Sequence, residues 1–398
     1  QERQAVMKVL MIRWKSICEP DMMQGFKENG IELDTWHYPG NDVDYNMDCL
    51  QKIVDLLMTN TYDFVFSVDY FPVVARACNA VKCIYVSWAV DCPVMQYYSK
   101  TISLPYNRIF LFDYAMYQEF LPQNPDNIFY LPLGAAVEHF DEVIAQITAE
   151  DRKKYANDLS FIGSTYQEKC KYNELTMLSK YTKGYADALI EMQLQIYGTN
   201  ILEQGLSEEF VDKFLQDISW GGMPEDYQNN PKAYIAQMVL GEKVTEQERL
   251  RLLKRLSDRF TFDFYTMSDT SSMPNIRDKG SAESRIEMPK IFHLSRINLN
   301  MTSKTIRTGI PQRLWDIMGS GGFVLTNYQQ ELEQYFELGK DLETYGSFDE
   351  CEQKIAYYLS HEEERKKIAQ SGYEKVCKWY TYRQRVADLL AIVKGGQV

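Results

Sequence analysis

Runs of apolar residues alternate with amphipathic stretches along the first third of the chain. Residues 6–14 (VMKVLMIRW) are typical of a buried strand, and residues 45–58 carry apolar side chains at helical spacing along one face. Near-continuous apolar strands that alternate with helices predict a parallel sheet covered on both faces. The strands expected here are Val6–Trp14, Ile31–Tyr38, Tyr62–Val68, Cys83–Ala89, Arg108–Phe112 and Ile128–Leu133, and the clearest helices are Glu19–Asn29 and Tyr45–Met58.

A charged stretch at Glu150–Asn157 interrupts this alternation, and the strand pattern restarts at Leu159–Gly163. We therefore expect a domain boundary near residue 155 and a second doubly wound domain over 156–380, with 166–256 as a helical elaboration and a final helix over 381–398. Its strands are expected at Phe260–Thr266, Arg296–Thr302 and Phe323–Asn327, and its helices at Glu174–Lys180, Tyr185–Leu194, Glu246–Leu256, Glu287–Leu294, Pro311–Gly319, 348–380 and Tyr382–Val393. The predicted fold class is α/β with two Rossmann-like domains and a cleft between them.

The amino-acid composition argues against several classes of protein. The chain of 398 residues has a net charge of -13, which argues against nucleic acid as the main partner because phosphate backbones need a basic surface. No apolar stretch is long enough to span a membrane. The eight cysteines form no CxxC pair and the four histidines do not cluster, so we expect reduced thiols, no metal site and a cytoplasmic location.

Small residues follow the first strand of the second half. Ligands of doubly wound sheets bind beyond the carboxyl ends of the strands. There, Gly163, Ser164 and Thr165 could bring backbone N–H groups close to a phosphate, aided by the N-terminus of a following helix. The alternative is a plain turn between a strand and a helix.

The segment over residues 305–322 (TIRTGIPQRLWDIMGSGG) carries more information. It has a tight loop at Thr308 and Gly309, a helix that bears Asp316, and a turn at Gly321 and Gly322. Three basic residues lie in or beside it in an otherwise acidic chain, and they could neutralise donor phosphates without a metal ion: Lys304, Arg307 and Arg313. The alternative is a solvated basic loop followed by an ordinary helix carboxylate.

Two carboxylates end strands of the first domain. Asp91 follows the strand at Cys83–Ala89, and Asp69 follows the neighbouring strand. Either could take a proton from an acceptor hydroxyl, and we prefer Asp91 as the catalytic base. Each could instead cap the N-terminus of a helix, because a proline follows shortly after both.

Taken in order, these motifs resemble the CgeB-like (spore maturation protein) glycosyltransferases. The resemblance rests on residues 65–72, 87–93, 110–113 and 130–133 in the first half, and on 161–164, 287–292, 297–300, 309–327 and 371–382 in the second. It implies the GT-B fold, with an acceptor domain at 1–155, a nucleotide-sugar donor domain at 156–380 and a last helix that crosses back to the first domain. It further implies that Asp316 holds the donor ribose and that Glu287 and Met288 lie near the nucleobase.

The expected function is a metal-independent transfer of sugar from a nucleoside diphosphate sugar, UDP-sugar above others, to a glycan or protein acceptor. The tripeptide Asp42-Val43-Asp44 has the DxD spacing, but this motif is too short to establish a metal-dependent transferase by itself. No other cofactor is expected. Two alternatives stay open: a protein that binds a nucleotide or sugar without turnover, and a nucleotide-sugar epimerase on the same fold.

Overall fold

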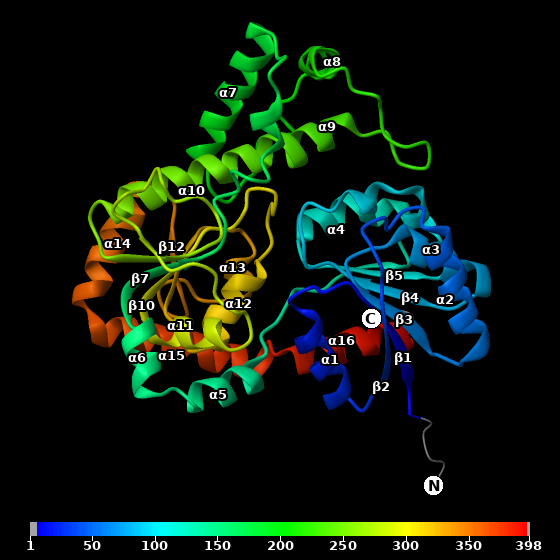
Figure 1. Cartoon of the computed structure of the whole chain (residues 1–398), viewed down its shortest axis with the longest axis horizontal. Coiled ribbons are helices and arrows are strands. Elements are labelled where there is room, and N and C mark those ends of the chain that lie inside the picture. Colours follow the sequence, from blue (N-terminus) through cyan, green and yellow to red (C-terminus); the bar gives the residue numbers. More distant parts are fainter. Residues whose placement is uncertain (1–5, 396–398) are drawn as a thin grey trace. The chain divides into compact units, whose positions relative to one another are not determined.

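The computed structural model describes residues 6–395, and they form two compact units (Figure 1). Among these residues, unit 1 contains 6–134, 223–229 and 380–395, and unit 2 contains 135–222 and 230–379. Each unit is built on a six-stranded sheet in which all neighbouring strands are parallel. The predicted α/β class with two Rossmann-like domains is therefore confirmed.

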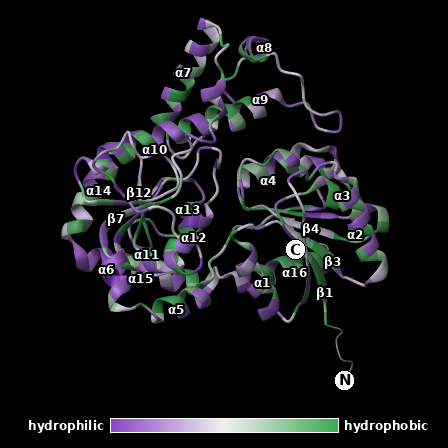
Figure 2. Ribbon diagram, viewed as in Figure 1, coloured by the Kyte–Doolittle hydropathy of each residue, from purple (hydrophilic) through white to green (hydrophobic). Residues whose placement is uncertain are grey.

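Unit 1 has the strand order β2-β1-β3-β4-β5-β6. Helices α1 and α16 pack together on one face of this sheet, and α2, α3 and α4 lie on the other (Figure 1). Its central strands are apolar and fully buried, whereas the edge strand β2 is polar and partly exposed (Figure 2). The elements of unit 1 are β1 (Lys8–Arg13), α1 (Glu19–Glu28), β2 (Glu32–His37), α2 (Met47–Thr59), β3 (Phe64–Val68), α3 (Pro72–Val81), β4 (Tyr85–Trp88), η1 (Met95–Tyr98), η2 (Lys100–Ser103), β5 (Asn107–Leu111), α4 (Tyr114–Phe120), η3 (Leu121–Gln123), β6 (Ile128–Tyr130) and α16 (Tyr382–Gly395).

Unit 2 has the strand order β12-β11-β10-β7-β8-β9. Its elements are α5 (Val137–Ala145), α6 (Ala149–Tyr155), β7 (Asn157–Ile162), η4 (Lys171–Glu174), α7 (Lys180–Leu194), α8 (Glu208–Asp217), α9 (Pro231–Ala233), η5 (Tyr234–Gly241), α10 (Glu242–Ser257), β8 (Phe262–Tyr265), β9 (Arg277–Asp278), α11 (Glu287–Leu294), β10 (Ser295–Asn300), α12 (Gln312–Gly319), β11 (Val324–Asn327), α13 (Leu332–Tyr335), β12 (Glu343–Tyr345), α14 (Phe348–Ser360) and α15 (Glu362–Trp379).

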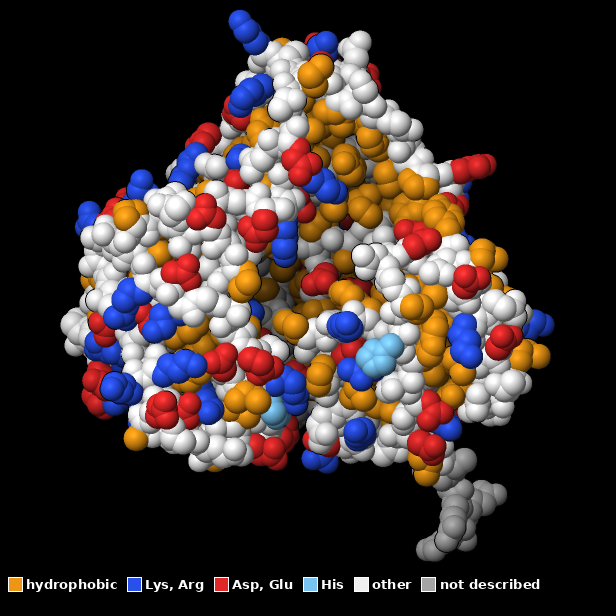
Figure 3. All heavy atoms as spheres, in the orientation of Figure 1, with side chains coloured by type: hydrophobic (Ala, Val, Ile, Leu, Met, Phe, Trp, Pro, Cys, Tyr) orange, Lys and Arg blue, Asp and Glu red, His pale blue; other side chains and the backbone are white. Residues whose placement is uncertain are grey.

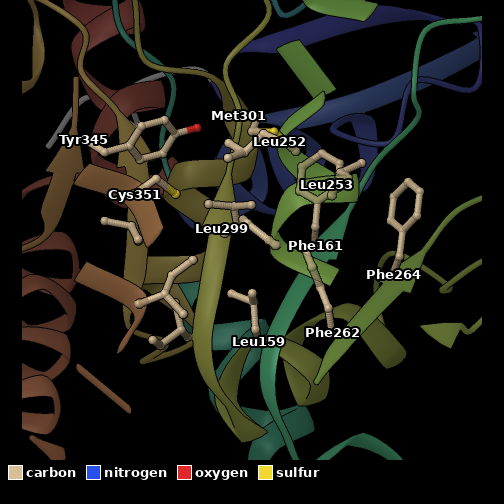
Figure 4. Packing of buried hydrophobic residues seen from close by; sticks show 14 of the residues in the cluster. Leu159, Phe161, Leu252, Leu253, Phe262, Phe264, Leu299, Met301, Tyr345 and Cys351 are labelled. Atoms are coloured by element: carbon tan, nitrogen blue, oxygen red, sulfur yellow. The ribbon is translucent and has the colours of Figure 1, made fainter. Parts of the chain in front are cut away.

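Two apolar cores stabilise unit 2. In the first, Leu252 and Leu253 of α10 pack with Leu159 and Phe161 of β7 and with Leu299 of β10 (Figure 4). The second is mainly helical and buries side chains of α7, α8, η5 and α10 against one another. The predicted helical elaboration at 166–256 therefore has a core of its own. Charged side chains of both signs are interspersed over the surface seen in Figure 3.

The first unit ends at Gly134, rather than near residue 155 as expected. The charged stretch that suggested a linker is instead α6, whose charges pair with α11. Lys290 contacts Asp151 at 2.9 Å and Lys154 contacts Glu287 at 2.9 Å. Asp151 also forms a capping box with Thr148. The polarity of this segment thus reflects ion pairs within unit 2, not a solvated boundary.

One predicted helix is placed wrongly. Residues 175–179 are not helical, and Ser179 accepts a hydrogen bond from the Thr182 backbone and caps a helix that starts at Lys180. The stretch expected to be helical over 348–380 is confirmed, and it consists of two helices, α14 and α15, which are separated at His361. The short strands β9 and β12 were missed, since they have only two and three residues.

A pair of helical glycines gives a test of the packing. Alanine at Gly372 in α15 would place its Cβ 2.2 Å from the Asp341 carbonyl oxygen, whereas at Gly184 in α7 it would meet nothing within 4 Å. Gly372→Ala should destabilise the fold by ~1–3 kcal/mol through overpacking. Gly184→Ala should stabilise it by ~0.5–1 kcal/mol, since alanine favours helix. Chemical denaturation of both variants checks this, and equal effects of the same sign would contradict the packing described.

Candidate active site

The switch point of unit 2 lies between β7 and β10. The chain moves from β7 to β8 and β9 on one side, and then returns to build β10, β11 and β12 on the other. The segments that leave β7 and β10 therefore diverge at the carboxyl edge of the sheet, which is where doubly wound folds bind ligands. These segments are residues 163–165 and 301–309, both of which the sequence singled out.

The turn after β7 is tightly held. The Gly163 N–H donates to the Tyr265 carbonyl at 3.1 Å, and the Thr165 N–H donates to Ser268 Oγ at 2.9 Å. Thr165 is buried, while Gly163 and Ser164 are half-buried. The expected helix after this turn is absent from the described chain, because residues 166–169 form a turn and the next α-helix starts at Lys180. No helix dipole therefore assists binding here.

Arg249 of α10 joins the two segments at the switch point. Its Nη1 donates to the Ser164 carbonyl and its Nη2 to the Met301 carbonyl, each at 2.7 Å. The side chain is 8% exposed and lies over the rings of Phe161 and Tyr166. Burial lowers the pKa of Arg249, and the nearby guanidinium of Arg313 lowers it further. A fixed positive charge thus lies directly at the switch point.

Sequence reasoning missed Arg249 because it belongs to a helix far from any motif. Two further polar residues were missed, and both hold the segment after β10. Glu331 accepts a hydrogen bond from the Thr308 hydroxyl at 2.7 Å, and Gln329 donates to the carbonyls of Ile306 and Gly309 at 3.1 and 3.3 Å. All three are buried polar side chains, a signal that only the folded structure reveals.

Lys304 does not extend toward a ligand as expected. It is 8% exposed and its Nζ lies 3.4 Å from Oε1 of the fully buried Glu248, over the ring of Tyr197. Its backbone N–H donates to the Thr245 hydroxyl at 3.0 Å. A buried carboxylate requires a counter-charge, so Lys304 anchors the segment to α10. Arg307, by contrast, is half-buried in the same segment.

Helix α12 carries two further charged groups near this edge. Asp316 accepts a hydrogen bond from Gln312 at 2.8 Å and lies 3.7 Å from the Arg313 guanidinium. Both charged side chains are partly exposed, at 16% and 22%. The first turn of α12, which follows Pro311, also lies at this edge. A carboxylate, a guanidinium and a helix N-terminus therefore occur together.

Glu287 and Met288, the two residues expected near the nucleobase, have different neighbours. Glu287 accepts hydrogen bonds from Tyr155 at 2.5 Å and Lys154 at 2.9 Å, so it links α11 to α6. The Tyr155 hydroxyl, followed by the Glu283 backbone, lowers the pKa of Glu287 to about 2. Met288 instead contacts Arg313 through its sulfur at 2.9 Å and borders the α12 site.

Gly321 and Gly322 lie at the opposite edge of the sheet from these residues. They form the turn between the end of α12 and the start of β11. Gly321 has a φ of +70°, and a Cβ at Gly322 would lie 2.7 Å from the Phe292 carbonyl oxygen. Their assignment to donor binding is therefore wrong, because backbone geometry and close packing explain both glycines.

In unit 1, the two candidate carboxylates lie together at the carboxyl edge of β3 and β4. Asp69 Oδ1 accepts hydrogen bonds from the backbone N–H groups of Val90 at 2.9 Å and Asp91 at 3.2 Å. Asp69 is 4% exposed and has a φ of +58°, whereas Asp91 is exposed. Burial, followed by the charge of Asp91, raises the pKa of Asp69 well above its usual value.

Neither carboxylate is a helix cap. The N-cap residue of α3 is Phe71, and Asp91 is followed by a bend and a short 3₁₀ segment rather than an α-helix. Two buried hydroxyls in this unit, on Ser87 and Tyr97, have no hydrogen-bond partner among the described residues. Tyr97 lies close enough to Asp69 for that carboxylate to raise its pKa further, after burial itself. The arrangement pairs a buried carboxyl, whose pKa is raised, with an exposed one.

Two features were sought in residues 6–395, the part of the chain that the structure describes: a membrane-spanning helix and a metal site. No helix there combines the length and apolar character that crossing a bilayer requires. No three His, Cys, Asp or Glu side chains in this range lie close enough together to hold a metal ion. Six of the cysteines in this range are free thiols: Cys49, Cys78, Cys83, Cys170, Cys351 and Cys377.

Comparison with known proteins agrees with this architecture. The glycosyltransferase from Rickettsia africae ESF-5 has a similar structure, with a TM-score of 0.57 and 12% identity over 98% of this chain and 99% of that one. Anabaena Alr3699/HepE in complex with UDP-glucose has a TM-score of 0.51 and 10% identity, over 97% and 99% of the two chains. The N-terminal domain of Candida albicans trehalose-6-phosphate phosphatase has a TM-score of 0.54 and 9% identity, over 98% and 97%.

These likenesses, at such low identity, concern the fold. A comparison with curated proteins yields no match. Residues 247–391, from α10 into α16, match a family model described as glycosyl transferase-like. The chain thus has the GT-B fold of two Rossmann-like domains, and much of its second unit is glycosyltransferase-like in sequence.

Proposed function

We propose that this protein transfers a sugar from a UDP-sugar to a hydroxyl or amide group of a glycan or protein, without a metal ion. The observation that carries the proposal is the set of charged groups at the switch point of unit 2. Arg249 and Arg313 supply positive charge, and Asp316 supplies a carboxylate, where doubly wound folds bind ligands. The family match over this unit and the UDP-glucose named for the Anabaena structure support the donor class.

In this proposal each group has one task. The two guanidinium groups and the first turn of α12 stabilise the diphosphate as it departs. Asp316 accepts hydrogen bonds from the two ribose hydroxyls. Asp91 of unit 1 removes the acceptor proton. As the acceptor oxygen or nitrogen bonds to the anomeric carbon, the bond from that carbon to the diphosphate breaks, and its electron pair leaves with UDP.

Asp69 has a positioning role in the proposal. Its buried carboxyl fixes the Val90 and Asp91 backbone, so the exposed Asp91 side chain extends from a rigid segment. The more specific assignment to the CgeB-like family rests on the sequence motifs and belongs to the proposal. A donor-hydrolysis assay separates a transferase from a protein that only binds the nucleotide. Recovery of a donor with an inverted ring centre would favour an epimerase.

The ribose contact gives the first test. Asp316→Ala should weaken UDP binding by ~10–100-fold, because a charge-assisted contact contributes ~1.5–3 kcal/mol. It should leave the binding of 2′,3′-dideoxy-UDP unchanged. Isothermal titration calorimetry measures both, with Glu337→Ala as a matched control, since Glu337 is an exposed carboxylate of the same unit. Equal UDP affinity in wild type and Asp316→Ala would exclude the ribose role.

The base gives the second test. Asp91→Asn should lower the rate of UDP release from UDP-glucose by ~10²–10⁴-fold, because the amide cannot accept the proton. UDP affinity should be unchanged, since the donor is assigned to unit 2. The control is Asp126→Asn, an exposed carboxylate of the same unit. If UDP release proceeds at the wild-type rate, Asp91 is not the base.

The raised pKa of Asp69 predicts that the stability of the fold depends on pH. Its folded-state pKa is raised, so its contribution to stability is complete below the unfolded pKa and is lost as pH rises through the folded pKa. Asp69→Asn keeps the acceptor oxygen and tolerates a positive φ. The melting temperature of the variant minus that of wild type should therefore increase from acidic to alkaline pH. A constant difference would show that Asp69 ionises freely in the folded protein.

A further inference from the structure

A cavity with a volume of about 890 Å³ lies at the amino-terminal edge of the sheet in unit 2. The starts of β10 and β11 form one side, at Ser295, Arg296 and Phe323, and the first three turns of α15 form another. Gly321, at the far end of α12 from the proposed donor site, also lines it. Because strands β10 and β11 separate the two edges, this cavity is distinct from the donor site.

Basic side chains outnumber acidic ones around this cavity. Five permanent cations line it, together with His293, against three carboxylates. One carboxylate, Glu362, already pairs with Lys366 at 2.6 Å. The cations are Arg152, Arg296, Arg365, Lys366 and Lys367, and the other carboxylates are Glu363 and Glu374. In a protein whose net charge is -13, this is a local reversal of sign.

The positive charge of Arg365 at this cavity is only partly compensated by the protein. The residue is 7% exposed, and its Nη1 donates to the Arg296 carbonyl at 2.6 Å. Its Nε has no hydrogen-bond partner among the described residues, although a buried charged donor without an acceptor costs stability. Burial lowers the pKa of Arg365, and the nearby Arg296 guanidinium lowers it further. Asp158 pairs with Arg296 at 2.9 Å and offsets only part of this positive charge.

We propose that this cavity is a binding site for a phosphate monoester of a sugar or another small polyol, held through Arg365 and its neighbouring cations. A phosphate accepts several charge-assisted hydrogen bonds and suits guanidinium groups in particular. The volume is within the range of small-ligand pockets and far larger than phosphate alone needs. Glu363 and the Gln370 amide, which donates to Glu374 at 2.8 Å, also line the cavity, and such polar groups suit the hydroxyls of the attached polyol.

The test uses calorimetric titration of glucose 6-phosphate, inorganic phosphate and glucose into the full chain. Glucose 6-phosphate should bind more tightly than phosphate, and glucose should not bind measurably. Arg365→Lys and Lys367→Gln should each weaken glucose 6-phosphate binding by about 10–100-fold, the loss expected for charge-assisted contacts. Lys367 is exposed, so its variant tests the site even if Arg365→Lys fails to fold.

Two control variants place the ligand. Lys378→Gln makes the same change of charge on α15 outside the cavity and should leave binding intact. Arg313→Gln alters the donor edge and should also leave it intact. No saturable binding of glucose 6-phosphate to wild type, or equal losses in Lys367→Gln and Lys378→Gln, would overturn the proposal. Loss of binding in Arg313→Gln alone would assign the phosphate to the donor site instead.

Discussion

The parallel direction of every strand pair is the constraint on which the rest of this structure depends. A parallel sheet covered on both faces leaves no room for a ligand except at the strand ends. The reversal of strand order then opens a crevice at one place along the carboxyl edge, between β7 and β10 in unit 2 and between β1 and β3 in unit 1. The charged groups of α12 and the carboxylate Asp69 lie beside these two places.

Buried charge fixes the shape of the proposed donor edge. Arg249 binds one carbonyl on each side of the switch point, and the pair of Lys304 with Glu248 anchors the segment after β10 to α10. Removing a charge from water is costly, so such groups adopt only geometries that satisfy them. The segments are therefore held before any ligand arrives, and a preorganised site avoids the free-energy cost of ordering them during binding.

The two ends of α12 lie at opposite edges of the sheet. Its N-terminus lies at the proposed donor edge, and the turn after its C-terminus lines the basic cavity at the other edge. The glycines of that turn are explained by packing, whereas Arg313 and Asp316 remain exposed enough to meet a ligand. The segment over residues 305–322 therefore contains charged residues of the proposed site in its first part and closely packed glycines in its last part, and the direction of α12 separates the two.

The sequence by itself determined the fold class and the approximate position of most strands, because buried parallel strands require apolar runs such as residues 64–68 and 159–162. It also identified the segments at both carboxyl edges, since small residues and carboxylates directly follow those runs. Only the tertiary structure decided which charges are available. Lys304 and Glu287 are paired with residues distant in sequence, and Arg249 reaches the switch point from a helix outside every motif. Local sequence patterns indicate which face of a helix or strand is apolar. The partner of a charged side chain, in contrast, depends on how distant segments pack together.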